Sequence, residues 1–163
     1  MKKALVFLLT MMLCVFSAVP VSAQNTLTVA DGTGTNRTLP FFGEYADCDQ
    51  HSQIIYPESM IAGLAGDTIT GMTFYISQAY STFFPNLLTV SLGISVASGL
   101  STLNTVTELT QVYSGEVIIE DNLLIVEFET PFVYMGGNLL FDLMLSDGEY
   151  YSDASFYGIT SAG

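Results

Sequence analysis

The amino-acid sequence predicts an all-β fold: an antiparallel two-sheet β-sandwich, jelly-roll-like, with about eight to nine short strands. Two observations predict it. Apolar and polar residues alternate with a period of two along most of the chain, which is typical of strands with one buried face. Turns rich in glycine, asparagine and proline separate these stretches, and no segment after the first residues has the periodicity of a long helix.

The first expected elements in chain order are short. Thr26–Val29 and Gln53–Tyr56 are candidate strands, and we interpret Asp31–Asn36 as a glycine-rich turn. Pro57–Ala65 predicts a helical turn, because proline suits the start of a helix and a glycine follows the segment. The turn is too short to form an independent element.

The longer strands follow. Thr70–Ile76, Leu88–Val96 and Leu123–Glu129 alternate between apolar and polar residues, so each should bury one face. Gln111–Ser114 and Glu116–Ile119 are shorter candidates between them.

The last clear strand is Asn138–Leu145, which is apolar on both faces and is therefore expected to be central in its sheet. Gly136 and Gly137 before it predict a tight turn with positive φ, and Pro131 predicts a connection that begins after the preceding strand. The residues that we expect to be buried are Leu92, Phe128, Phe141 and Leu143.

Residues 1–23 have the pattern of a secretory signal peptide. Lys2 and Lys3 precede an apolar run over Ala4–Val19, and Val21–Ala23 has the small residues of a cleavage site. We therefore expect a secreted protein, extracellular or at the cell surface, with a single domain over 24–163. Both lysines would leave with the leader, so that Arg37 alone would face 16 acidic residues.

This charge excludes two classes of partner, because nucleic acids and anionic membranes both require clustered lysine and arginine. The sequence also lacks common catalytic motifs. His51 is its only histidine, and it has no nucleophile elbow, Walker loop or dinucleotide-binding motif. Cys48 lies between two aspartates, which disfavour a thiolate, so we interpret it as a small, partly buried side chain. Counting alone leaves open a carboxylate pair of a glycosidase, but we expect a protein that is not an enzyme.

Acidic and aromatic residues in the expected loops are the candidate binding residues. Calcium takes several oxygen ligands from loops, and it is the only cofactor that the sequence suggests. Its candidate ligands are Asp47, Asp49, Asp147 and Asp153. Loop aromatics stack on sugar faces or anchor protein contacts. The candidates of this kind are Tyr45, Tyr80, Phe83, Phe84, Tyr150 and Tyr151. The alternative, in which several of them fold back as lids on the ends of the sandwich, stays open.

A series of short motifs extends over nearly all of the chain after the leader: Val29–Thr33, Gln53–Pro57, Ile69–Tyr75, Val112–Gly115, Thr130–Tyr134, Gly136–Leu140 and Phe156–Gly158. Together they resemble the N-terminal β-sandwich module of secreted multidomain proteins of Bacteroidota. Such modules often precede fibronectin type III or adhesin-like domains and a C-terminal signal for type IX sorting. The resemblance implies a non-catalytic, surface-exposed role and brings no catalytic residues. In its pattern a further strand-bearing segment follows, so we expect the domain to continue beyond Gly163.

The sequence therefore predicts a secreted, non-catalytic β-sandwich module of an adhesin-like protein, which mediates an interaction or acts as a structural spacer. Its expected partners are a glycan or protein surface and the remaining domains of a longer parent chain. The alternative is a carbohydrate-binding module that uses the loop aromatics, with a structural calcium.

Overall fold

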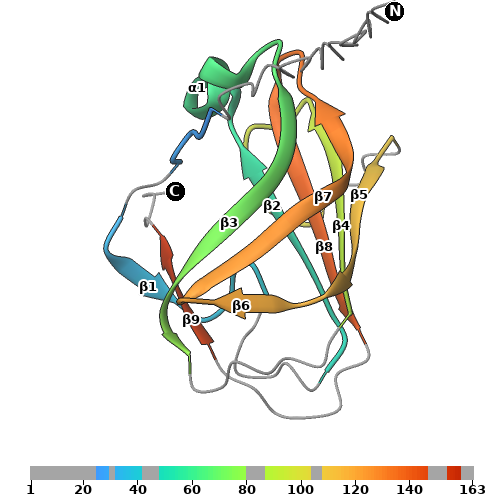
Figure 1. The fold of residues 1–163 in the computed structure, drawn as a ribbon. Helices are drawn as coiled ribbons and strands as arrows, with labels where there is room; N and C mark the ends of the chain where they lie inside the picture. The colour runs from blue at the N-terminus through green and yellow to red at the C-terminus, as the bar shows by residue number, and fades with distance from the viewer. Residues whose placement is uncertain are drawn as a thin grey trace, which may run out of the picture.

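The computed structural model describes residues 25–29, 32–41, 48–79, 87–103, 108–146 and 154–158. These residues form two antiparallel sheets that pack face to face, which confirms the predicted two-sheet β-sandwich (Figure 1). One sheet has five strands in the order β1-β9-β3-β7-β6, and the other has four strands in the order β2-β8-β4-β5.

The strands range from three residues in β1 to twelve in β3. The five-stranded sheet consists of β1 (Gly34–Asn36), β9 (Ala154–Gly158), β3 (Thr68–Ala79), β7 (Leu123–Val133) and β6 (Ile118–Glu120). The four-stranded sheet consists of β2 (Gln50–Tyr56), β8 (Asn138–Ser146), β4 (Leu87–Ser95) and β5 (Thr110–Glu116).

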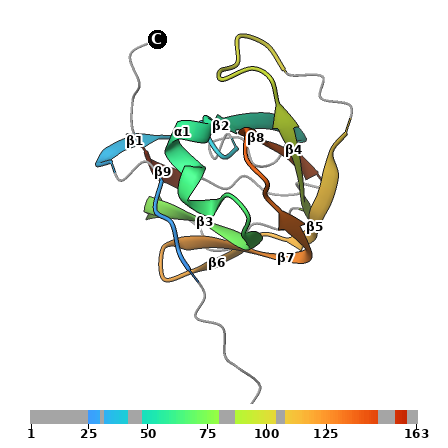
Figure 2. The same ribbon diagram turned by 90° about the horizontal axis from the view of Figure 1, so that it is seen from above.

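The predicted helical turn is present as α1 (Glu58–Ile61), followed by a 3-10 turn over Ala62–Leu64. Seen from above, α1 lies at the upper end of the sandwich, between the two layers (Figure 2). Ile61 is buried and belongs to the core. The short helix therefore closes one end of the sandwich.

The core lies between the sheets and follows the period-two pattern of the strands. The four residues that we expected to be buried, Leu92, Phe128, Phe141 and Leu143, are all buried in it. The buried apolar face of β4 ends earlier than the alternation predicted: Ile94 and Val96 are exposed. Val96 follows the end of the strand, and Ile94 is its penultimate residue.

β8 has the central place that its two apolar faces predict. It pairs with β2 on one side and with β4 on the other. Its inward residues, such as Phe141, join the core, and its outward residues Leu140 and Asp142 are also buried. Burial on both faces explains why this strand lacks the simple alternation of its neighbours.

β5 and β6 are two parts of one extended stretch that changes sheets. β5 ends at Glu116 beside β4, whereas β6 begins at Ile118 beside β7. Val117 lies between them and is buried. The bend at this residue joins the two sheets along one side of the sandwich (Figure 1).

The prediction was wrong at both ends of the domain. Thr26–Val29 is not a strand, although Val29 packs against the core. Gly34–Asn36, which we interpreted as part of a turn, forms β1 and pairs with β9. β9 was not predicted, because a five-residue segment with Phe156 as its main apolar residue carries too little period-two pattern.

Pro131 was expected after the end of a strand, but β7 continues through it to Val133. The pairing of β3 with β7 shifts register between Ile69 and Gly71. Ile69 pairs with Phe132 and Gly71 pairs with Glu127, so Pro131 falls in the irregular stretch, where no ladder bond requires its missing N–H.

The predicted turn before β8 is confirmed, since Gly136 and Gly137 have φ values of 112° and 95°. The preceding Tyr134 is fully buried, and its hydroxyl donates a hydrogen bond of 2.6 Å to the carbonyl of Gly137. A Cβ on Gly137 would lie 2.8 Å from Cγ2 of Ile94. The turn thus needs glycine for its backbone conformation and for the close approach of β4.

Buried tyrosines should make the fold sensitive to alkaline pH. Burial raises the pKa of Tyr134, and the Glu58 carboxylate raises it further. Burial raises the pKa of Tyr56 and of Tyr113 as well. Because unfolded tyrosines ionise near pH 10, the stability from these groups is complete below about pH 10 and falls as the pH rises towards their folded pKa values. Urea unfolding between pH 8 and 11.5 should show this fall.

Tyr134→Phe tests how much Tyr134 contributes to this loss of stability at alkaline pH. The variant should lose about 1 kcal/mol at pH 8, because the Gly137 carbonyl loses its donor. It should also show a smaller fall in the free energy of unfolding above pH 10. A fall as steep as in the unsubstituted protein would contradict this assignment.

Candidate functional site

The loop aromatics predicted to bind a ligand, Tyr45, Tyr80, Phe83, Phe84, Tyr150 and Tyr151, lie outside the described residues. Three of the four candidate calcium ligands, Asp47, Asp147 and Asp153, lie outside them too. The strand ends that flank these segments can be placed. Gln50 pairs with Leu145, Leu87 pairs with Ser146, and Ala79 pairs with Ala154. All these strand ends lie at the lower end of the sandwich in Figure 1.

Asp49 is the only candidate calcium ligand within the described residues, and it lies directly before β2. Among the residues that the structure describes, no three His, Cys, Asp or Glu side chains form a group that could hold a metal ion. Cys48, which we expected to be partly buried, is exposed.

A polar cluster that the sequence did not predict lies on the outer face of the four-stranded sheet. Asp142 of β8 is 8% exposed and accepts two hydrogen bonds on the same oxygen, Oδ2. Nε2 of His51 lies 2.8 Å away, and Nε2 of Gln53 lies 2.5 Å away. Both donors belong to β2, the neighbouring strand.

The sheet register explains how these residues meet. Gln53 is the direct partner of Asp142 across the β2–β8 pair, and His51 is two residues away on the same face. On the other side of β8, Asp142 pairs with Ser91 of β4, which pairs in turn with Gln111 of β5. A row of polar side chains therefore crosses this sheet. His51 and Asp142 are 91 residues apart in the sequence, and Gln53 and Asp142 are 89 apart, so no local motif joins them.

The hydrogen bonds of this cluster stabilise the sheet. A buried carboxylate needs hydrogen-bond donors to offset its loss of water, and the imidazole and amide supply two. Since a carboxylate only accepts, Nε2 of His51 carries the proton in this bond. The bonds join β2 to the central strand.

Asp142→Ala should test this role. The substitution leaves the His51 and Gln53 donors without their acceptor and should lower the free energy of unfolding by about 1.5–3 kcal/mol. Met144→Ala is a matched control, because Met144 faces the same way on β8 and is half exposed. Denaturant unfolding that shows equal effects for both variants would contradict the role of Asp142.

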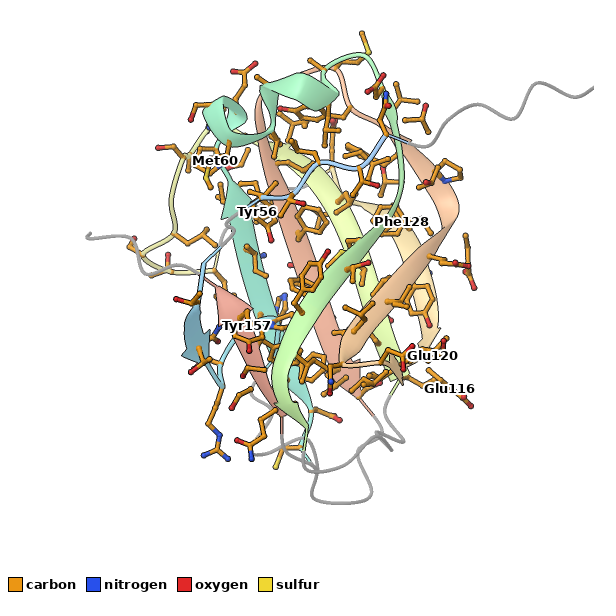
Figure 3. The ribbon with its side chains drawn as sticks, turned by 60° about the vertical axis from the view of Figure 1, so that its left-hand side comes forward. Tyr56, Met60, Glu116, Glu120, Phe128 and Tyr157 are labelled. Atoms are coloured by element: carbon orange, nitrogen blue, oxygen red, sulfur yellow. The ribbon has the colours of Figure 1, made fainter. Side chains whose placement is uncertain are left out.

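The outer face of the five-stranded sheet is different. Tyr75 of β3 and Tyr157 of β9 are 52% and 48% exposed. Ile76 and Phe156, their neighbours in sequence, are register partners that point into the core. Because side chains alternate along a strand, Tyr75 and Tyr157 both lie on the outer face, each next to a residue of this register pair. Figure 3 labels Tyr157.

Acidic residues gather at another part of the surface. Glu116 of β5 and Glu120 of β6 lie at the corner where the chain changes sheets (Figure 3). Glu127 and Glu129 follow on β7, and all four residues are exposed. In contrast, β1, β3 and β9 contain no charged residue. The five-stranded sheet thus has an uncharged part and an acidic part.

The sequence could predict one residue of the uncharged face, Tyr75. Placing Phe74 and Ile76 on the inner face of their strand puts Tyr75 on the outer face. Tyr157 had no such signal, because β9 was not predicted.

The described residues thus define an all-β two-sheet sandwich with one uncharged and tyrosine-bearing outer face. Comparison with known proteins adds no relative: no family model, curated protein or solved structure matches the chain. Among the helices in the described part of the chain, none has the length and apolar character to span a membrane.

Proposed function

We propose that this protein is a secreted, non-catalytic recognition module of a cell-surface or extracellular adhesin-like protein. The leader pattern supports secretion, and the resemblance to surface modules supports a role as one domain of a longer chain, whose other domains would be its covalent neighbours. The module would contact an external surface or hold neighbouring domains apart.

The observation that carries the proposal is the uncharged outer face of β1, β9 and β3. Two tyrosines are about half exposed there, with no charged residue on the three strands. Tyrosine supplies a large apolar contact area together with a polar hydroxyl, which is why it is enriched at contact surfaces. Exposed aromatic groups reduce solubility, and an exposed aromatic face rimmed by polar residues is typical of an interaction site.

Binding to immobilised surfaces tests the proposal. The mature chain should be retained, saturably, on at least one member of a panel of neutral polysaccharides, mucin and extracellular-matrix proteins. Retention should change little between 50 and 500 mM salt, because an uncharged contact is not screened. If the chain binds no member of the panel, a recognition role is contradicted and the role of a spacer remains.

A carbohydrate-binding module that uses the lower end of the sandwich is the second candidate. The observation that favours it is that the strand ends flanking all three aromatic-bearing segments meet there. Loss of glycan binding in Tyr80→Ala and Phe84→Ala, with binding kept in Tyr75→Ala, would support this candidate over the sheet face.

The calcium proposal belongs to the same end. If Asp47, Asp49, Asp147 and Asp153 bind calcium, millimolar calcium should raise the melting temperature by mass action. Magnesium should raise it less, because it gives up its water ligands reluctantly. An equal rise with both ions would indicate screening of the acidic surface, and no calorimetric heat of calcium binding would remove the site.

A further inference from the structure

We infer that the uncharged face of β1, β9 and β3 binds a neutral glycan, with Tyr75 and Tyr157 as the platform on which its sugar rings stack. The inference rests on the proposed recognition function and names its ligand class. The site is defined by four residues on the outer face: Thr35, Thr73, Tyr75 and Tyr157.

The register places these four residues together. Thr35 of β1 is the direct partner of Tyr157 of β9. Tyr157 and Tyr75 are the next residues beyond the register pair of Phe156 and Ile76, where the pairing of β9 with β3 ends. Directly opposed residues have Cβ atoms about 5 Å apart, so Thr35 and Tyr157 are immediate neighbours, and Tyr75 is the next outward side chain on the adjacent strand β3. Thr73 lies two residues from Tyr75 on the same face, and it is exposed.

The sheet holds the two aromatic rings in place. Phe156, beside Tyr157, makes edge-to-face contacts with Phe41 and Phe74, at centroid distances of 5.5 and 6.5 Å. Phe74 in turn precedes Tyr75. Each platform tyrosine therefore follows a core phenylalanine on a paired strand. Its backbone is already ordered, so ligand binding costs little conformational entropy of the protein.

The composition of the face selects a neutral, hydroxyl-rich ligand. Its exposed groups are phenol rings, phenol hydroxyls and threonine hydroxyls, with neither charge nor aliphatic side chains among the four residues. A pyranose ring offers a face of C–H groups that packs on an aromatic ring and hydroxyls that hydrogen-bond with such neighbours. Anionic polysaccharides are disfavoured, because the chain as a whole has a formal net charge of −13.

A protein partner fits the face less well. Protein interfaces are built around buried apolar anchors and are enriched in methionine and arginine besides aromatics. Leu123 and Ile125 of β7 are the register partners of Tyr75 and Thr73 on this face, but both are only partly exposed. The exposed aliphatic residue Ile118 lies one strand further away, on β6. The two tyrosines themselves offer hydroxyls.

Native affinity electrophoresis suits this acidic chain, which migrates to the anode. Neutral β-glucan, galactomannan and starch would be cast separately into the gel as probes, with alginate as an anionic counterpart. We expect at least one neutral polysaccharide to retard the mature chain and alginate not to retard it. The double variant Tyr75→Ala/Tyr157→Ala should weaken the retardation about tenfold or more.

Two further variants separate loss of the platform from loss of the fold. Tyr75→Thr/Tyr157→Thr replaces the aromatic residues with β-branched ones, which also favour strands. It should lose binding like the alanine pair, with an unchanged circular dichroism spectrum. Met144→Ala removes an equally exposed apolar side chain from the other sheet and should bind normally.

Three results would overturn the inference. No retardation by any neutral polysaccharide, together with capture by a matrix protein that needs the two tyrosines, would leave the recognition function standing with another ligand class. Retardation that survives both double variants would place the glycan elsewhere on the domain. Stronger retardation by alginate than by neutral glycans would contradict the argument from charge.

Discussion

Phe141→Ala is expected to lower the free energy of unfolding by about 3–5 kcal/mol. Phe141 is 6% exposed on the central strand β8, and its ring contacts Tyr56 edge to face at a centroid distance of 5.3 Å. The substitution removes an aromatic ring from a core that lies between two sheets, and the paired backbones of β2 and β4 on either side limit how far the cavity can close. Denaturant unfolding at neutral pH measures the loss.

Met144→Ala is the control for this experiment, because it truncates a half-exposed side chain of the same strand. It should change the free energy by no more than about 0.5 kcal/mol. A loss below about 1 kcal/mol for Phe141→Ala would show that this ring is not part of a packed core.

Phe156→Ala should have an effect of similar size, about 3–5 kcal/mol. Phe156 is 1% exposed and contacts Phe41 and Phe74 in one aromatic cluster. Such ring contacts stabilise the fold beyond the effect of the buried area. Since β9 has only five residues, this side chain is its main anchor to the core. The variant should also bind less of any ligand that requires Tyr157, in proportion to the loss of β9.

Tyr157→Ala, the neighbouring substitution, truncates an outward side chain and should cost far less stability. Hydrogen exchange should report the difference locally. Amides of β9 should exchange faster in Phe156→Ala than in Tyr157→Ala, and equal protection in the two variants would contradict the anchoring role of Phe156.

The long strands were predictable because each of them buries one face against a single core. Leu88, Val90 and Leu92 are all buried, as their alternation requires. The position of β8 was predictable for the opposite reason, since only a strand with neighbours on both sides and cover on both faces is apolar at nearly every position. Backbone conformation at Gly136 and Gly137 also followed from local chemistry, because few other residues accept their φ values.

Short edge elements were not predictable from the same pattern. β1 consists of Gly34, Thr35 and Asn36, which individually favour turns, and tertiary pairing with β9 makes them a strand. Thr26–Val29 has the better strand composition but no partner strand among the described residues. For β1 the outcome depends on residues more than 100 positions away, which no local window contains.

The candidate sites depended on the same long-range information. His51, Gln53 and Asp142 were visible as polar residues, yet only the β2–β8 register places them on one oxygen atom. Tyr75 and Tyr157 likewise come onto adjacent strands only through the pairing of β3 with β9. Loop aromatics can be found from local composition, whereas a face built by three strands has no counterpart in the linear sequence.

The place of β9 has a consequence for how the chain folds. This strand comes last in the described order, yet it lies inside the five-stranded sheet, and the side chain of Asn36 donates a hydrogen bond to the carbonyl of Phe156, 120 residues further along. Closing so long a loop costs chain entropy before any contact offsets it, so folding should take on the order of milliseconds to seconds, as in other sandwiches. During synthesis the sheet cannot close until Ala154–Gly158 has emerged from the ribosome.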